Sequence, residues 1–228
     1  MTQITSTYID HMGSDLSVVN AARVSFGKKS ECEETRFVEM TDWCGDMPVV
    51  NERDTKLIKY LAKHKHISPF GHAFASFHVK APIFVARQLV KHKFLRWNEI
   101  SRRYVDDEPE FYTPDVWRGR SADKKQGSEG TWQPNHEQLD KTMYKVLDLY
   151  DQMIYDGCAP EQARMVLPQS TMTEWYWSGS LDAFADMCNL RCKEDTQYES
   201  RLVADQVSTI MQDLYPVSWA ALMEGETE

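Results

Sequence analysis

The 228-residue sequence has no run of eighteen apolar residues, and its first ten residues do not combine a basic stretch with an apolar core. A membrane-spanning helix needs about 20 mostly apolar residues, and a secretory leader needs that basic and apolar pattern. We therefore expect a cytoplasmic protein with no membrane partner. One globular domain over residues 1–228 is long enough to bury roughly 70% of its unfolded surface.

Cysteine is scarce and its spacing is uninformative. The five cysteines form no CxxC pair and lack histidine partners at zinc-finger spacing. Cys188 and Cys192 lie four residues apart, so they share one face of a helix, but two thiolates alone make an incomplete zinc site. We expect reduced thiols and no metal site.

Positive charge is also in short supply, with a net charge of -9. This balance argues against a nucleic-acid partner, because such proteins usually carry a basic domain. The cations are nevertheless concentrated over residues 87–103, which carry +5 and leave -14 for the rest of the chain. A local basic segment on an acidic protein indicates a small anionic ligand.

Hydrophobic periodicity predicts a mixture of strands and helices. Leu139, Met143, Val146 and Tyr150 recur at helical spacing, for example. We expect strands over 3–10, 73–80 and 171–177. We expect helices over 14–23, 53–64, 82–93, 135–155, 160–167, 181–193 and 196–213. Because residues 118–130 are almost free of apolar side chains, that segment is predicted to be an exposed loop.

The basic segment joins a predicted helix end to an extended stretch that is rich in hydrogen-bond donors. It runs from Lys91-His92-Lys93 to Ser101-Arg102-Arg103. Lysine and arginine neutralise phosphate, and Arg103 offers a planar fork for a bidentate contact. A solvated helix terminus is an equally good explanation on composition alone, since basic residues favour helix C-termini.

A longer pattern distinguishes these alternatives. The Lys91-His92-Lys93 triplet, seven further residues and Ser101 resemble the Arg-His-Arg, seven-residue, Ser motif of flavin-dependent thymidylate synthases. The resemblance extends over the stretches 77–88 and 98–104. It continues in a second block formed by residues 163–168, Thr173, Asn189-Leu190-Arg191, Gln197 and Glu199. In all it covers roughly residues 54–216.

This resemblance implies a binding site for dUMP. The implied residues are Gln88, Leu89, Val90, Lys91, Glu99, Ile100, Ser101, Arg102, Arg103, Arg164 and Arg191. The basic members and Ser101 would take the phosphate. Arg191 would face the uracil ring, where a guanidinium stabilises the negative charge of the activated base. An ion pair of Arg191 with Glu194 or Asp195 is the structural alternative.

Arg191, Ser101 and His66 are the implied catalytic residues. We favour nucleotide binding over covalent catalysis for Ser101, because a serine without a neighbouring base is a weak nucleophile. His66 matches a family histidine near the nucleotide and flavin, which favours a positioning role. Glu161 precedes Arg164 by one helical turn and is expected to orient it.

The resemblance also implies FAD as the cofactor. The implied contacts are Ser68, Lys91, His92, Lys93, Glu99, Ser180, Leu181, Asp182 and Asp186. The family commonly has asparagine and arginine in the stretch 180–186, and arginine rather than lysine in the triplet. Lysine is a point charge where arginine is a fork, so we expect altered flavin affinity rather than lost chemistry.

The implied activity is reductive methylation of dUMP to dTMP, with 5,10-methylenetetrahydrofolate as carbon donor, NADPH as reductant and tetrahydrofolate as product. The implied fold is α/β of the α+β type, with a central, largely antiparallel sheet flanked by helices. The family forms homotetramers with shared active sites. Two alternatives remain: a flavoenzyme that makes another C5-modified product, and a non-catalytic nucleotide or single-stranded nucleic-acid binder in which Trp97 and Tyr104 stack on bases.

Overall fold

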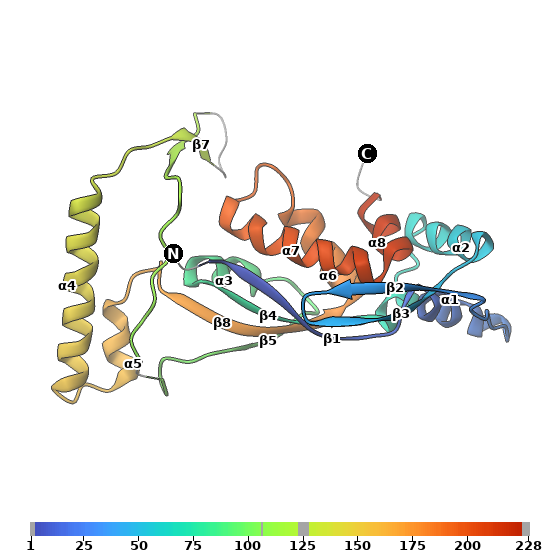
Figure 1. The fold of residues 1–228 in the computed structure, drawn as a ribbon, viewed down its shortest axis with the longest axis horizontal. Coiled ribbons are helices and arrows are strands. Elements are labelled where there is room, and N and C mark those ends of the chain that lie inside the picture. The colour runs from blue at the N-terminus through green and yellow to red at the C-terminus, as the bar shows by residue number, and fades with distance from the viewer. Residues whose placement is uncertain (1–2, 106, 123–127, 225–228) are drawn as a thin grey trace.

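The computed structural model describes residues 3–105, 107–122 and 128–224 (Figure 1). The strands are β1 (Thr5–Met12), β2 (Glu34–Met40), β3 (Trp43–Val49), β4 (Phe74–Pro82), β5 (Arg96–Glu99), β6 (Arg118–Arg120), β7 (Ser128–Thr131) and β8 (Met172–Ser180). The α-helices are α1 (Asp15–Arg23), α2 (Glu52–Lys63), α3 (Ile83–Leu89), α4 (His136–Tyr155), α5 (Pro160–Ala163), α6 (Leu181–Arg191), α7 (Tyr198–Leu214) and α8 (Pro216–Met223). The 3-10 helices are η1 (Val24–Phe26), η2 (Ser68–His72) and η3 (Arg164–Val166).

The central sheet has the strand order β1-β4-β8-β5, and every neighbouring pair is antiparallel. Along β4, Ala75, Phe77 and Val79 are buried while the residues between them are partly exposed, so one face of the strand points into the core. Trp175 and Trp177 of β8 are buried on the same face. The expected antiparallel sheet with flanking helices is confirmed.

Helices α3, α6 and α7 cover this apolar face, and α8 packs against α2, α6 and α7 (Figure 1). The ring of Phe184 on α6 meets Phe77 and Trp177 edge to face, with centroid distances of 5.1 and 5.4 Å. Such edge-to-face pairs add to the burial of apolar area and fix the position of α6 over the sheet.

The predicted helix over 82–93 ends early, at Leu89. Residues 90–95 form a turn in which Phe94 has a left-handed φ of 65°. The turn brings Leu95 against β8 at Gly179, where a Cβ atom would overlap Leu95 Cδ2. The missing side chain of Gly179 thus lets the chain reverse and add β5 beside β8, which places the Lys91–Lys93 triplet in a turn instead of a helix.

Three elements were not predicted from the sequence: the β2–β3 hairpin, helix α8 and the β6–β7 hairpin. The last corrects the predicted loop over 118–130, of which residues 123–127 lie outside the described ranges. Arg118 Nε donates to Ser128 Oγ across this hairpin at 2.8 Å, and the Trp132 amide donates to the Trp117 carbonyl at 2.8 Å. Polar side-chain contacts and backbone hydrogen bonds therefore stabilise the hairpin, although its strands lack alternating apolar residues.

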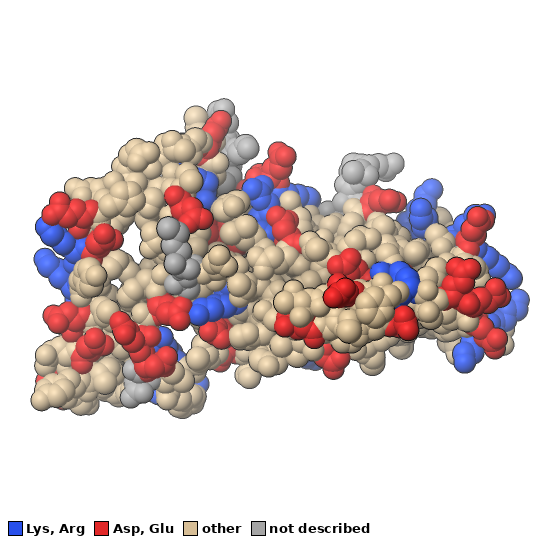
Figure 2. Space-filling model, in the orientation of Figure 1, with Lys and Arg blue, Asp and Glu red and all other residues tan. Residues whose placement is uncertain are grey.

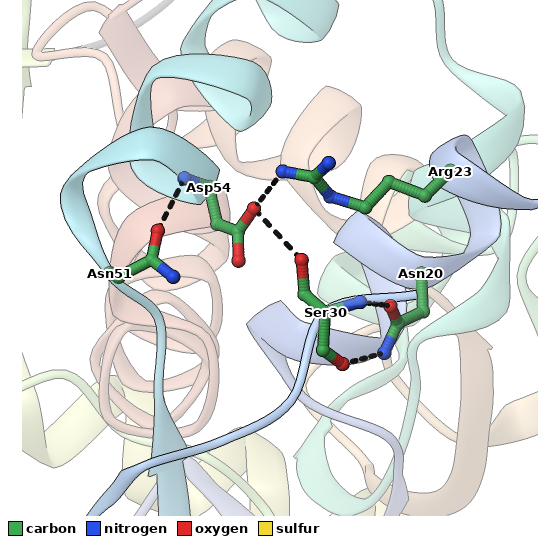
Figure 3. Close-up of polar contacts among 5 residues, drawn as sticks. All are labelled: Asn20, Arg23, Ser30, Asn51 and Asp54. Atoms are coloured by element: carbon green, nitrogen blue, oxygen red, sulfur yellow. Dashed lines mark hydrogen bonds and ion pairs between the residues drawn. The ribbon is translucent and has the colours of Figure 1, made fainter. Parts of the chain in front are cut away.

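A buried ion pair fastens α1 to α2 (Figure 3). Arg23 at the end of α1 pairs with Asp54, whose side chain is 1% exposed in the first turn of α2. Ser30 Oγ donates to the same carboxylate oxygen at 3.1 Å, and the Asn51 side chain caps α2 by accepting from the Asp54 amide. Because a buried carboxylate needs a partner, the pair fixes the two helices to each other.

Helix α4 stands at the end of the molecule away from α1 and α2, where it contacts α5 and η3 (Figure 1). Only Tyr150 of this helix is buried in the chain as described. Acidic and basic side chains are mixed over the visible face of the molecule (Figure 2). No helix within the described ranges is long and apolar enough to cross a membrane.

Candidate nucleotide site

A hollow of about 740 Å³ lies beside the C-terminal end of α6, and we name it the Arg191 hollow. It is lined by residues of α3, the turn after α3, β6, α6 and α7. Lys91, Arg118 and Arg191 bring three cations to its wall, against the single carboxylate of Glu199. The hollow therefore favours a ligand with negative charge.

A hydrogen-bond network fixes the polar groups of the Arg191 hollow. The Gln88 amide donates to Gln197 Oε1 and accepts from Ser200 Oγ at 3.2 Å. Gln197 in turn donates to Glu199 at 3.3 Å, and Glu199 pairs with Arg118. Glu199 is 3% exposed, so its charge is compensated by Arg118 rather than by water. These contacts hold α3, α7 and β6 in fixed positions around the hollow.

At the other wall, Arg191 Nε donates to His92 Nε2 at 3.0 Å. Burial and the charge of Arg191 together lower the pKa of His92 to about 4, so the imidazole is neutral near pH 7. Burial also lowers the pKa of Arg191. Within the described residues, Arg191 therefore contacts His92 and forms no ion pair with Glu194 or Asp195.

Tyr112 adds a neutral donor to the Arg191 hollow. Burial and the nearby charge of Glu199 raise its pKa to about 12, so the hydroxyl keeps its proton near neutral pH. A protonated phenol can donate a hydrogen bond to a ligand carbonyl or phosphate oxygen.

A second hollow, of about 480 Å³, lies between the end of β5, the start of β8 and η3, and we name it the Arg164 hollow. Glu99 accepts from Thr173 Oγ1 at 2.7 Å and from Trp97 Nε1 at 3.0 Å, so β5 is fixed against β8 at its wall. Arg164 Nε donates to the backbone carbonyl of Glu161 at 3.2 Å. The expected orientation of Arg164 by Glu161 therefore uses the main chain and not the carboxylate.

Helix α3 separates the two hollows. Ile83 and Arg87 face the Arg164 hollow, while Phe84 and Gln88 face the Arg191 hollow. Each pair is spaced by four residues and therefore shares a helix face, and the two pairs are offset by one residue, about 100° around the axis.

The residues implied for dUMP are divided between the two hollows. Gln88, Lys91 and Arg191 line the Arg191 hollow. Glu99, Ile100, Arg102 and Arg164 line the Arg164 hollow. The remaining implied residues line neither: Leu89, Val90, Ser101 and Arg103. One chain therefore presents two partial sites on different sides of α3.

The structure shows the surroundings of two of these residues, Leu89 and Ser101. Leu89 is fully buried in the core, so its side chain lines neither hollow, and its assignment to dUMP stays a prediction. Ser101 Oγ accepts from Arg103 N and Nε at 3.3 Å. The described contacts of Ser101 include no histidine or carboxylate base, in keeping with a binding role.

The residues implied for FAD follow helix α6. Ser180 precedes the helix, and Leu181 and Asp182 form its first turn, although Leu181 is fully buried and its amide donates to the Ala73 carbonyl at 2.9 Å. The turn after α3 runs from His92, which contacts Arg191 at the C-terminal end, to Leu95, which contacts Gly179 just before the helix. Cationic Lys91 and Lys93 flank His92 in this turn.

The other implied FAD contacts are more dispersed. Ser68 lies on η2, which packs against α6. Glu99 lines the Arg164 hollow, and Asp186 is exposed on α6. The implied catalytic His66 is exposed beyond the end of α2, where its ring approaches those of Tyr60 and His64. His66 lines neither hollow.

Sequence reasoning missed Tyr112, Arg118 and Glu199 as residues of the Arg191 hollow. Glu199 was part of the resemblance but was given no role. Arg118 was assigned to an exposed loop, and no pattern in that polar segment distinguishes it from its neighbours. Only the pairing of β6 with β7 brings it to the hollow.

The fold and the Arg191 hollow define an α/β protein that presents cationic side chains for a small anionic ligand. The family described as thymidylate synthase complementing protein matches residues 7–217. A flavin-dependent thymidylate synthase of Thermus thermophilus is 38% identical over 218 residues, which are 95% of this chain and 74% of the relative. One of Kosmotoga olearia is 36% identical over 220 residues, which are 94% of this chain and 88% of the relative.

A solved structure is also similar. The crystal structure of the UMP/dUMP methylase PolB from Streptomyces cacaoi, bound with 5-Br dUMP, has a TM-score of 0.80 and 30% sequence identity. The match covers 98% of this chain and 96% of PolB. The chain belongs to the thymidylate synthase complementing protein family.

Proposed function

We propose that the chain is a flavin-dependent thymidylate synthase that converts dUMP to dTMP, with 5,10-methylenetetrahydrofolate as carbon donor and NADPH as reductant. The observation that supports this most directly is the Arg191 hollow, in which Gln88, Lys91 and Arg191 come together from three separate segments. These are the residues that the family resemblance assigns to dUMP. In this proposal residues 1–228 form a single domain with this activity.

In the proposed site Arg191 stabilises negative charge on the pyrimidine as its C5 atom becomes nucleophilic. A guanidinium that donates to the carbonyl oxygen beside N3 favours this charge more in the transition state than in the ground state. Gln88 is fixed by its two hydrogen bonds, so it offers a rigid wall beside the base. Arg102, Arg103 and Arg164 neutralise the phosphate, and Ser101 binds it.

The residues present fit a flavin. Asp182 Oδ1 at the start of α6 is buried and has no hydrogen-bond partner within the described residues, so it can accept from a bound ligand. Lys91 and Lys93, on either side of His92, add positive charge that can neutralise a pyrophosphate. When bound, the flavin supplies the hydride that completes the methyl group, a step that amino-acid side chains cannot perform.

The proposal includes a homotetramer with active sites shared between subunits. Helix α3 separates Arg102 and Arg164 from Arg191, and a second copy that brings its Arg164 hollow to the Arg191 hollow of the first would complete one site. His66 would likewise reach the nucleotide of a neighbouring subunit. A cytoplasmic location is also proposed, and the five free cysteines agree with a reducing compartment.

A direct test incubates the purified protein with dUMP, methylenetetrahydrofolate and NADPH, with and without added FAD, and identifies the products by mass spectrometry. FAD-dependent formation of dTMP and tetrahydrofolate is expected. An Arg191→Ala variant should lose the product, while Arg53→Ala, which removes an exposed arginine from α2, should not. A different C5-modified nucleotide would contradict the proposed chemistry, and binding without any product would favour a non-catalytic role.

The likeness to PolB favours one second candidate, a methylase that also accepts UMP, because PolB is described as acting on both nucleotides. Repeating the incubation with UMP in place of dUMP decides this question. Equal product from both nucleotides would support the broader activity, and product from dUMP alone would exclude it.

A further inference from the structure

We infer that His92 is a positioning residue for the pyrimidine: as a neutral hydrogen-bond acceptor it holds the Arg191 guanidinium by Nε and turns its two terminal NH2 groups toward the base. The inference rests on the proposed function and adds to it. The resemblance assigns His92 to the flavin and leaves the orientation of Arg191 unexplained. The structure supplies a contact between them.

The contact depends on the turn that replaces the end of the predicted helix. The His92 amide donates to the Leu89 carbonyl at 3.1 Å, so the backbone of His92 is fixed to the end of α3. Phe94 and Gly179 fix the other end of the turn against β8. The imidazole therefore approaches Arg191 from a rigid segment and not from a free helix terminus.

The direction of the hydrogen bond determines the form of the imidazole. Arginine has five N-H donors and no acceptor, so His92 Nε2 must accept and the proton must lie on Nδ1. Protonation of His92 would replace this hydrogen bond with a repulsion between two cations. The charge of Arg191 and the burial of the ring both favour the neutral form, which lowers the pKa of His92 to about 4.

The geometry leaves the other donors of Arg191 available. His92 engages Nε, and the described part of the chain provides no hydrogen bond to the two terminal nitrogens. Arg191 lines the hollow with Gln88 and Lys91, so its remaining donors can address a ligand there. A ring whose carbonyl oxygens accept hydrogen bonds, as in uracil, is oriented by such a fixed guanidinium edge, because an arginine free to rotate loses entropy on binding.

The first experiment separates recognition of the base from recognition of the phosphate. Dissociation constants are measured by calorimetry for dUMP and for 2-deoxyribose 5-phosphate, which lacks the pyrimidine. His92→Ala should weaken dUMP binding about tenfold or more and leave 2-deoxyribose 5-phosphate unchanged. His92→Gln, whose Oε1 can replace Nε2 as acceptor, should recover part of the affinity. His136→Ala, which removes an exposed histidine from the start of α4, is the matched control.

The possible results have distinct meanings. Equal weakening of both ligands by His92→Ala would overturn the inference in favour of a general structural role. Unchanged dUMP affinity together with weakened FAD binding, measured by flavin fluorescence, would overturn it in favour of a flavin contact. Failure of the unaltered protein to bind dUMP would contradict the proposed function itself.

A second measurement tests the contact without any ligand. The His92 ring is titrated by NMR in the unaltered protein and in Arg191→Leu. Removing a neighbouring positive charge favours protonation, so the pKa of His92 should rise from about 4 toward its ordinary value of about 6.5. An unchanged His92 pKa, or a neutral ring with the proton on Nε2, would refute the proposed hydrogen bond.

Discussion

At the scale of single residues, the two lysines of the Lys91–Lys93 triplet are the clearest departure from the family motif. Both are exposed beside α6, and a lysine makes single-point contacts where arginine offers a fork. Restoring arginine at both positions should tighten FAD binding by about two- to tenfold, because bidentate contacts to phosphate become possible. Fluorescence titration of FAD measures the change.

The matched control for this substitution is Lys145→Arg on the exposed face of α4, which should leave the FAD dissociation constant unchanged. If the double substitution also leaves it unchanged, then Lys91 and Lys93 do not contact the pyrophosphate. In that case the flavin depends on the residues at the start of α6.

Individual site residues could be predicted here only where a motif identified them. Gln88, Lys91 and Arg191 were named from the sequence and do line one hollow. The contact between His92 and Arg191 joins residues 99 apart, and no helical or strand spacing relates them. The motif includes Leu89 but does not record that its side chain points into the core.

At the scale of elements, α8 shows why a helix can escape prediction. It begins at Pro216, and its own N-terminal residues provide no side-chain cap. The cap comes from Asp15 in the first turn of α1, which accepts from the Val217 amide at 3.0 Å and the Ser218 amide at 2.9 Å. A sequence window around α8 cannot contain a residue that lies more than 200 positions earlier.

Loss of this remote cap should destabilise the protein. Asp15→Ala leaves one buried and one partly buried helix amide without an acceptor, so the free energy of unfolding should fall by about 2–4 kcal/mol. Urea denaturation measures the loss. Asp10→Ala is the control, since exposed Asp10 accepts from its neighbour His11, and its substitution should cost less than about 0.5 kcal/mol. A similar loss in both variants would argue against the capping role.

Asp15 also makes a prediction about pH. Burial raises its pKa in the folded protein, although the hydrogen bonds from Ser218 and Val217 oppose that rise. Between the ordinary pKa of about 3.9 and the raised value, the folded state binds more protons than the unfolded state, so the stability contributed by Asp15 falls as the pH rises. The stability of the unaltered protein relative to Asp15→Asn should therefore be greater at pH 4 than at pH 7. A difference that grows with pH would contradict the raised pKa.

At the scale of the whole molecule, the sheet and most helices were predictable because their apolar periodicity records which face is buried. Strands β4 and β8 alternate along their length, and α2 and α7 repeat at helical spacing. The β2–β3 hairpin buries only Val38 and Met47 of its strand residues, so it carries little of that periodicity. The division of the site by α3 could not be predicted at all, because it depends on which face of a short helix meets each hollow.

That division leads to a test of the assembly. If one active site joins the Arg191 hollow of one chain to the Arg164 hollow of another, Arg191→Ala and Arg164→Ala should each abolish dTMP formation. Co-expression of the two variants with different tags allows both chains to enter one oligomer. About a quarter of the sites in a random assembly then combine two intact hollows, so about a quarter of the activity should return.

Two copies of the same variant, co-expressed with the same pair of tags, are the control and should remain inactive. Complementation requires that the two arginines act in the same site but belong to different chains. The mixed oligomer is isolated through both tags. If it is inactive, both arginines of one chain serve the same site. In that case α3 would have to move for the hollows to join. The unaltered protein could then be diluted until light scattering shows separate chains, and its turnover would be unchanged.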